Sequence, residues 1–144
     1  MSRRRVYFLT ALFAYSLGFF LYLAMESFYK SHFSSAATHF SMGLLAGLAF
    51  VFLLFLDKYR LPFFVKALSG AAFITLLEFF FGIYLNLYLG LGVWDYSAFA
   101  FDLLGQICPQ FSLIWFVLSC GVLWIDRFLL LAVRFFVGQG GEEA

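Results

Sequence analysis

Four long apolar stretches constrain the fold of this chain more than any other feature of its sequence. They cover residues 6–25, 40–56, 63–89 and 107–125. A helix needs about 20 mostly apolar residues to cross the hydrocarbon core of a membrane. Within lipid the backbone must satisfy its own hydrogen bonds, which leaves helices and closed barrels, and the alternating pattern of barrel strands is absent from the sequence. The pattern therefore predicts an all-α, polytopic membrane protein with four transmembrane helices.

The composition supports this fold class. Of the 144 residues, 65% are hydrophobic and only 12% are charged, against about 25% charged residues in average soluble domains. A soluble protein of this size has too much surface to hide so much apolar material. The net charge of +1 gives no basic surface of the kind that binds nucleic acid. We expect residues 1–144 to form one bundle, with the lipid bilayer as partner and no nucleic-acid partner.

The positive charges orient the predicted spans. Eight of the nine lysine and arginine residues lie before the first span, between or just inside the second and third, or after the fourth. They are Arg3, Arg4, Arg5, Lys58, Arg60, Lys66, Arg127 and Arg134. Cytoplasmic segments are enriched in such charges. Both termini are therefore expected in the cytoplasm, with segments 26–39 and 90–106 on the outer side.

Two shorter segments are not predicted to cross the membrane. Residues 126–137 carry arginines on one face of a helix and apolar side chains around it. This segment is either a cytoplasmic extension of the fourth helix or a helix on the inner leaflet. Residues 95–106 are too short to span, so they are expected to lie at the interface or to re-enter the bundle.

Glu78 is the one acidic or basic residue in the run 67–94. Inserting such a charge at the centre of a membrane helix costs about 2.5–3.5 kcal/mol, so it usually has a partner or a function. We expect Glu78 to be protonated, or to be paired with a cation or a hydrogen-bond donor. The sequence leaves open whether it serves transport or locks neighbouring helices together.

Other candidate residues lie along the same face of the predicted helix as Glu78. Gly82 and Asn86 follow at spacings that place them on the same helical face, and Thr75 lies about one turn inward. Beyond the span, the candidate stripe continues through Trp94, Asp95, Tyr96, Asp102 and Gln106. Trp and Tyr are also typical membrane-interface anchors. Asp95 could cap a short helix, and Asp102 and Gln106 share a face if a helix persists between them.

No catalytic, metal or cofactor site is predicted. The sequence lacks a Gly-Lys dipeptide, an H-E-x-x-H motif and a G-x-S-x-G motif, which excludes the usual Walker, zinc-protease and serine-hydrolase sites. Glu26, His32 and His39 do not have a recognised zinc spacing. Cys108 and Cys120 are expected to be unpaired packing residues. Gly43 and Gly47 have the small-xxx-small spacing that permits close helix approach in lipid.

Several blocks in the second half of the chain form a recognisable pattern. They are Ile74-Thr75-x-x-Glu78-Phe79-x-x-Gly82, Asn86, Leu89-Gly90-x-x-Val93-Trp94-Asp95-Tyr96-Ser97, Gly105-Gln106-Ile107-Cys108 and Phe111-Ser112-x-x-Trp115. With these blocks, residues 74–119 resemble the bacterial family catalogued as putative ABC-transporter type IV, the CmpB-like membrane proteins. The resemblance implies a permease of the bacterial cytoplasmic (inner) membrane and adds Ser112 to the candidate path. An ATP-driven role would require a separate ATPase subunit, and four helices are few to enclose a polar path, so a homo-oligomer is expected.

Three functions remain open at this stage. The favoured one is a permease subunit that moves a small polar or ionic solute along a path lined by Glu78, Asn86 and the outer carboxylates Asp95 and Asp102. The second is an accessory or assembly subunit whose polar stripe binds a partner helix. The third is a small membrane enzyme that acts on a lipid-linked substrate, with the same carboxylates as acid or base and Cys108 as a nucleophile.

Overall fold

A computed structural model of the chain describes residues 3–33 and 39–139. Its elements are α1 (Arg3–Phe33), α2 (Phe40–Leu56), α3 (Phe63–Gly82), the π-helix η1 (Ile83–Tyr88) and α4 (Pro109–Gln139). In this described part the only pairing of β type is an isolated bridge between Leu103 and Ile107. The predicted all-α class is confirmed.

Three helical segments are long and apolar enough to cross a membrane. They are Arg4–His32, Phe63–Tyr88 and Pro109–Val133. The remaining α-helix, α2, is apolar but has only 17 residues, a length of about 25 Å at 1.5 Å per residue. Large apolar side chains such as Phe8 and Phe128 lie exposed on the outside of the bundle, which is the surface expected of a protein embedded in lipid.

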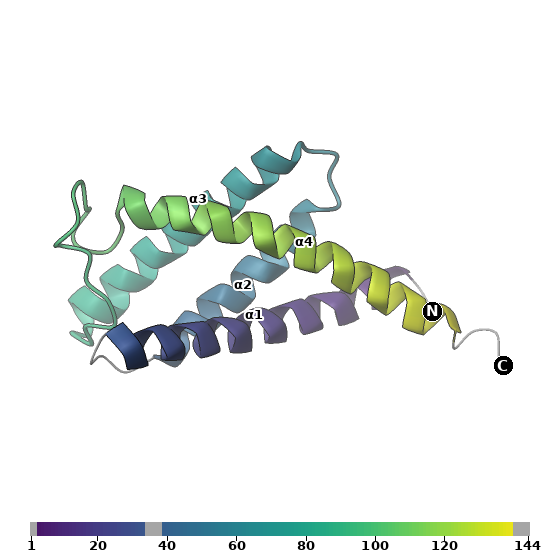
Figure 1. Ribbon diagram of the computed structural model, residues 1–144, viewed down its shortest axis with the longest axis horizontal. Coiled ribbons are helices and arrows are strands. Elements are labelled where there is room, and N and C mark those ends of the chain that lie inside the picture. Colours follow the sequence, from purple (N-terminus) through teal and green to yellow (C-terminus); the bar gives the residue numbers. More distant parts are fainter. Residues whose placement is uncertain (1–2, 34–38, 140–144) are drawn as a thin grey trace.

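The four helices run back and forth between two ends of the molecule (Figure 1). We call the end with residues 90–108 the loop end. The start of α1, the turn at residues 57–62 and the end of α4 lie toward the opposite end, which we call the terminal end. Two contacts tie the turn to its neighbours there. The Lys58 ammonium lies 4.6 Å from the ring centroid of Tyr7, and Lys66 donates to the Asp57 carboxylate at 2.8 Å.

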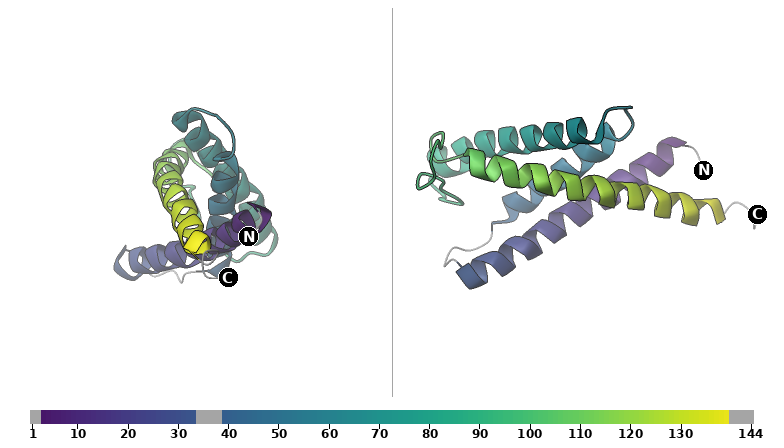
Figure 2. Two further views of the ribbon diagram at one scale, coloured as in Figure 1. Left: turned by 90° about the vertical axis from the view of Figure 1, so that its right-hand side faces the viewer. Right: turned by 45° about the horizontal axis from the view of Figure 1, so that its top comes forward.

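The bundle consists of two helix pairs. Contacts are most numerous between α1 and α2 and between α3 and α4. Between the pairs, α1 and α4 approach one another toward the terminal end and diverge toward the loop end (Figure 2). The central contact between pairs is made by Leu53 of α2, Ala67 of α3 and Leu123 of α4, all buried in one cluster.

Glycines explain the close packing of the first pair. A Cβ atom on Gly43 would lie 2.9 Å from Leu23, and one on Gly47 would lie 2.8 Å from Tyr15. Such distances are shorter than carbon atoms tolerate, so only glycine fits at both positions without a shift of these α1 side chains. The spacing of these two glycines permits a close approach of the helices, and the structure shows one between α1 and α2.

Candidate functional site

The third predicted span ends in a widened helical turn. The backbone N–H of Leu89 donates to the Tyr84 carbonyl at 2.9 Å, five residues back, within the π-helix η1. A π-turn holds more residues than an α-turn and is often found near functional sites. The regular α-helical spacing expected for Asn86 therefore does not hold beyond Gly82.

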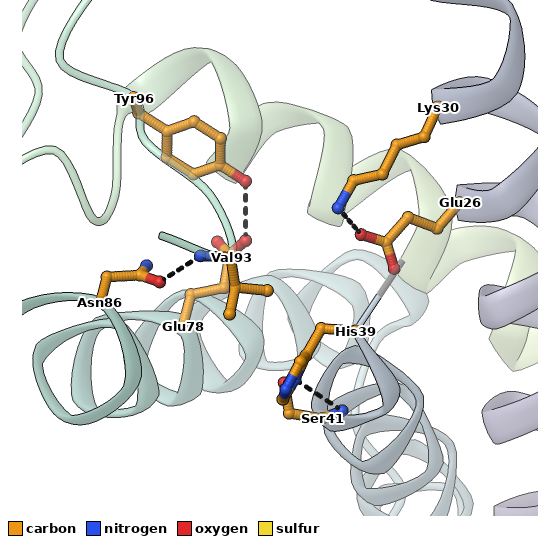
Figure 3. A network of polar contacts seen from close by, with 8 residues as sticks. All are labelled: Glu26, Lys30, His39, Ser41, Glu78, Asn86, Val93 and Tyr96. Atoms are coloured by element: carbon orange, nitrogen blue, oxygen red, sulfur yellow. Dashed lines mark hydrogen bonds and ion pairs between the residues drawn. The ribbon is translucent and has the colours of Figure 1, made fainter. Parts of the chain in front are cut away.

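Glu78 lies at the junction of three elements. Its side chain projects from α3 and only 2% of the residue is exposed. One carboxylate oxygen accepts a hydrogen bond from the Tyr96 hydroxyl at 3.0 Å (Figure 3). The other accepts from the indole N–H of Trp115 in α4 at 2.6 Å. The described residues form no ion pair with Glu78, so both of its partners are neutral.

Tyr96 is held in place by packing as well as by its hydroxyl. The residue is buried, and its ring stacks on Phe111 with centroids 4.2 Å apart and an interplanar angle of 17°. Burial raises the pKa of the Tyr96 phenol, and the neighbouring charge of Glu78 raises it further. The phenol therefore keeps its proton and remains a donor to Glu78.

A second network fixes the segment that carries Tyr96. The amide oxygen of Asn86 accepts from the backbone N–H of Val93 at 2.7 Å (Figure 3). The Asn86 amide nitrogen donates to the side-chain oxygen of Gln106 at 2.8 Å. The indole of Trp94 donates to the backbone carbonyl of Gln106 at 3.0 Å. Gln106 is itself buried, and its amide nitrogen donates to the Leu104 carbonyl at 2.9 Å. These bonds close the loop end over η1.

Gly82 makes room for this network. A Cβ atom at Gly82 would collide with the side-chain oxygen of Gln106 and lie 3.0 Å from its Cβ. The hollow that a glycine leaves on the helix surface is therefore filled by Gln106. The structure therefore shows close packing at this position.

The two carboxylates of the loop end serve local turns. Asp95 is exposed and accepts from the backbone N–H of Ser97 at 2.9 Å, which lowers the pKa of the Asp95 carboxyl. Asp102 accepts from the backbone N–H of Gly105 at 2.7 Å. No helix follows directly on Asp95 in the described structure, so it stabilises a turn and not the short helix that it could have capped.

The backbone explains why residues 95–106 do not form a helix. Phe101 has a φ angle of 61° and Leu104 one of 56°. Left-handed residues interrupt a right-handed helix, so Asp102 and Gln106 do not share a helical face as the sequence spacing would have allowed. Gly105, with a φ of 69°, packs against Asp95, whose carboxylate would lie 2.6 Å from a Cβ at this position.

Thr75 and Ser112 meet one turn further into the bundle. The Thr75 hydroxyl donates to the Ser112 hydroxyl at 3.1 Å, which joins α3 to α4. Ser112 in turn donates to the backbone carbonyl of Cys108 at 3.1 Å. Two candidate residues that lie far apart in sequence are thus brought together, but as a helix-to-helix bond.

A cavity lies beside Glu78. Its volume is about 200 Å³ and its walls come from all four helices. Among its lining residues only Tyr22, Glu78, Trp115 and Ser119 carry a side-chain oxygen or nitrogen. Ser119 is fully buried, and its hydroxyl has no hydrogen-bond partner among the described residues. The cavity is therefore apolar, with a single carboxyl group at its edge.

The sequence gives little sign that aromatic side chains form walls of this cavity. The rings of Tyr22 and Trp115 lie with centroids 6.0 Å apart and an interplanar angle of 41°. Trp115 was noted only within the family pattern, and Tyr22 not at all. The available signal was weak, because one tyrosine or tryptophan in so aromatic a chain indicates packing more often than a site.

Asp126 was also missed, because residues 126–137 were interpreted as a tail. Asp126 is fully buried, with 0% of its surface accessible to solvent. Neither of its carboxylate oxygens has a hydrogen-bond partner among the described residues. It lies in the unbroken helix α4, seven residues after Ser119. That spacing of two helical turns places both on one face and was the signal that could have identified it.

His39 has a structural role, and the two cysteines are not joined by a disulfide. His39 is the N-cap of α2, and its ring nitrogen accepts from the backbone N–H of Ser41 at 3.4 Å. Cys108 and Cys120 are both free thiols. The described part of the chain contains no group of three or more side chains suited to hold a metal ion.

Comparison with known proteins gives one family. The family model described as "Putative ABC-transporter type IV" matches residues 6–138. The match is wider than the blocks of residues 74–119 and covers all four helices. No curated protein and no solved structure matches the sequence.

Proposed function

The chain belongs to the family described as Putative ABC-transporter type IV, and from this premise we propose that it is a membrane permease subunit that moves a small polar or ionic solute past Glu78. The observation that carries the proposal is the position of Glu78. Its carboxylate is bonded to the loop end through Tyr96 and at the same time lines the cavity among the four helices.

The physical argument concerns charge. A carboxylate buried in a membrane protein is costly and is usually paired with a positive charge. Glu78 has two neutral donors and no cation among the described residues. A solute that carries a positive charge, or a proton, supplies the missing partner. We therefore favour a cation over an anion as the solute.

The loop end acts as the closure of the path in this proposal. Tyr96 contacts Glu78 directly, and Asn86, Gln106 and Trp94 hold the segment that carries Tyr96. Hydrogen bonds to charged groups contribute about 1.5–3 kcal/mol each. A change of that size is within the range of differential binding energies that shift conformational equilibria.

The other candidate residues have supporting roles. Gly82 admits Gln106 against the helix, while Thr75 and Ser112 fix the α3–α4 seam below Glu78. Asp95 and Asp102 lie at the outer rim, where their negative charge attracts cations from solution. The site residues of the path are thus Glu78 at its centre and the closure network around it.

The proposed location is the bacterial cytoplasmic membrane, with four spans. The terminal end faces the cytoplasm, because the positive charges gather there. α2 is short for a span, and tilt or local thinning of the bilayer accommodates such a helix. For uphill transport a separate ATPase subunit binds at the terminal end, whereas the downhill flux tested below needs the membrane subunit alone; homo-oligomers enclose the path.

The hydrogen bonds of Glu78 weigh against the two alternatives. An accessory subunit that binds a partner helix through this stripe would keep its polar groups available. Here Asn86 is bonded to Gln106 and to the backbone of Val93, and Glu78 accepts from Tyr96. An enzyme requires a nucleophile beside a base. Cys108 is buried, and Asp95 is engaged in a turn.

The test is cation flux into liposomes. The purified chain is reconstituted with a trapped pH dye, and proton entry is followed under an imposed membrane potential, alone and with added organic cations. We expect flux above that of empty liposomes, and its loss in Glu78→Gln. The control is Ser69→Ala, which removes a hydroxyl on the same helix that donates to the Val65 carbonyl one turn earlier. Equal flux in wild type and Glu78→Gln would overturn the proposed path.

A further inference from the structure

The cavity beside Glu78 joins features that rarely occur together. Fourteen of its eighteen lining residues are apolar in side chain or glycine, and Glu78 is the acid among them. An apolar cavity in a protein excludes water and accepts apolar molecules. A carboxylate at its edge favours a positive charge. The walls therefore suit a ligand that is apolar over most of its surface and cationic at one point.

The hydrogen bonds of Glu78 restrict the kind of cation. Each carboxylate oxygen already accepts one bond, from Tyr96 and from Trp115. A primary ammonium has three N–H donors to satisfy. Besides the remaining lone pairs of Glu78, the lining offers only the hydroxyl oxygens of Tyr22 and Ser119 as side-chain acceptors. A quaternary ammonium has no N–H groups and leaves no donor unsatisfied.

The aromatic walls favour the same class. Tyr22 and Trp115 both line the cavity, with ring centroids 6.0 Å apart, and Phe50 lines it from α2. Quaternary ammonium groups bind to aromatic faces through cation–π attraction, with Trp the strongest partner. Two or three such rings next to a carboxylate form a binding site for a methylated ammonium head.

The volume limits the size of the ligand. An apolar cavity of about 150 Å³ in another protein holds benzene, and this cavity measures about 200 Å³. One small ring or branched alkyl group fits, together with a trimethylammonium head. The walls include Met25 of α1 and Gly121 of α4. These two helices diverge toward the loop end (Figure 2).

We propose that this cavity is a binding site for small hydrophobic quaternary ammonium ions, with the charge against Glu78, Tyr22 and Trp115 and the apolar substituent among the residues of α2 and α4. The proposal rests on the permease function given above and names the class of its solute. It also assigns Tyr22, which the family pattern does not include, to the binding site.

The experiment measures equilibrium binding to the purified full chain in lipid nanodiscs. The probe is radiolabelled benzyltrimethylammonium, and the competitor is neopentylbenzene, which has the same shape with a neutral carbon in place of the nitrogen. We expect saturable binding of the cation and at least about tenfold weaker competition by the neutral molecule. Glu78→Gln is expected to weaken cation binding by at least about tenfold and to leave binding of the neutral molecule unchanged.

A second variant keeps the test valid if Glu78→Gln does not fold. Ala46→Leu places a larger side chain in the cavity wall and is expected to abolish binding of both molecules. Ser69→Ala, on the same helix as Glu78 but outside the cavity lining, is expected to bind like the wild type. Equal affinity for cation and neutral molecule would overturn the proposal, since it would mark a lipid-filled cavity.

The result is separable from that of the permease proposal. Absence of benzyltrimethylammonium binding, together with flux that depends on Glu78, would reject this solute class and leave the permease. Tight and selective binding without any flux would support the site and reject the permease.

Discussion

Trp115 and Glu78 lie 37 residues apart in sequence and are joined by a 2.6 Å hydrogen bond from the indole N–H to the carboxylate. The bond connects α4 to α3, and the Tyr96 hydroxyl connects the loop end to the same carboxylate. The Glu78 side chain therefore joins three segments of the chain, α3, α4 and the loop end, through side-chain hydrogen bonds.

Removal of the Glu78 carboxylate should destabilise the protein, and the loss should be larger for Glu78→Ala than for Glu78→Gln. Glu78→Ala leaves two buried donors without an acceptor, at about 1–3 kcal/mol each, so we expect a loss of roughly 2–6 kcal/mol in the free energy of unfolding. Glu78→Gln keeps one acceptor oxygen and should lose about half as much. Unfolding in mixed detergent micelles measures both. Equal losses in the two variants would show that the hydrogen bonds do not determine the effect.

A methyl group at Gly82 should open the closure network. Gly82→Ala forces Gln106 to move, and overpacking of this kind typically costs about 1–3 kcal/mol. Gly121→Ala is the matched control, since nothing lies within 4 Å of the added Cβ. Because alanine favours a helix over glycine by about 1 kcal/mol, the control should be neutral or more stable. A harmless Gly82→Ala would contradict the packing of Gln106 on this helix.

Asn86 should protect the backbone of Val93 from hydrogen exchange. Its side chain accepts from that N–H at 2.7 Å. In Asn86→Ala the amide loses its partner, and we expect exchange at Val93 to become about tenfold faster or more. Gln110→Ala, which removes a 3.3 Å bond to the Ala100 carbonyl, serves as the control. Protection of Val93 that survives Asn86→Ala would show that another group satisfies this amide.

Asp95 should contribute a small pH dependence at the loop end. The Ser97 backbone N–H lowers the pKa of Asp95 below its ordinary value of 3.8. A carboxyl with a lowered pKa stabilises the folded state at pH values above 3.8, and that contribution is lost as the pH falls below it. Thermal unfolding between pH 3 and pH 6, roughly the range of carboxyl titration, should lose part of its acid dependence in Asp95→Asn. An unchanged profile would mean that the Ser97 contact does not persist in solution.

Replacement of Asp126 by a neutral residue should stabilise the protein. Its carboxylate is buried, with no hydrogen-bond partner among the described residues, and burial of an unsatisfied polar group costs about 1–3 kcal/mol in proteins. Asp126→Leu should raise the free energy of unfolding by a similar amount, and Asp126→Asn should have a smaller effect. Detergent unfolding of the two variants, with flux measured in parallel, separates stability from function. A large destabilisation by Asp126→Leu would indicate a partner that the described residues do not include.

The helices could be predicted from the sequence because hydrophobic length determines them. The second apolar run, residues 40–56, coincides with α2, and Pro109 begins α4, where its missing N–H has no cost. The family pattern likewise identified the residues around Glu78, and the family is confirmed. These features depend on local composition and motif, which a single sequence contains.

The arrangement of the site could not be predicted in the same way. The positive φ angles of Phe101 and Leu104 occur in residue types that give no signal for them, so the shape of residues 90–108 was not accessible. The contact between Trp115 and Glu78 depends on how α3 and α4 are rotated against one another. That rotation follows from packing over the whole interface, and no motif encodes it.

The uneven packing of the two helix pairs has a mechanical consequence. Within the first pair, glycines bring α1 and α2 so close that a single methyl group would not fit at Gly43 or Gly47. Between the pairs, the cavity leaves part of the seam unfilled. The bundle thus combines one closely packed helix pair with a partly unfilled seam beside it. Lateral pressure from the bilayer is expected to change this seam before it separates α1 from α2, and Glu78 lines the seam.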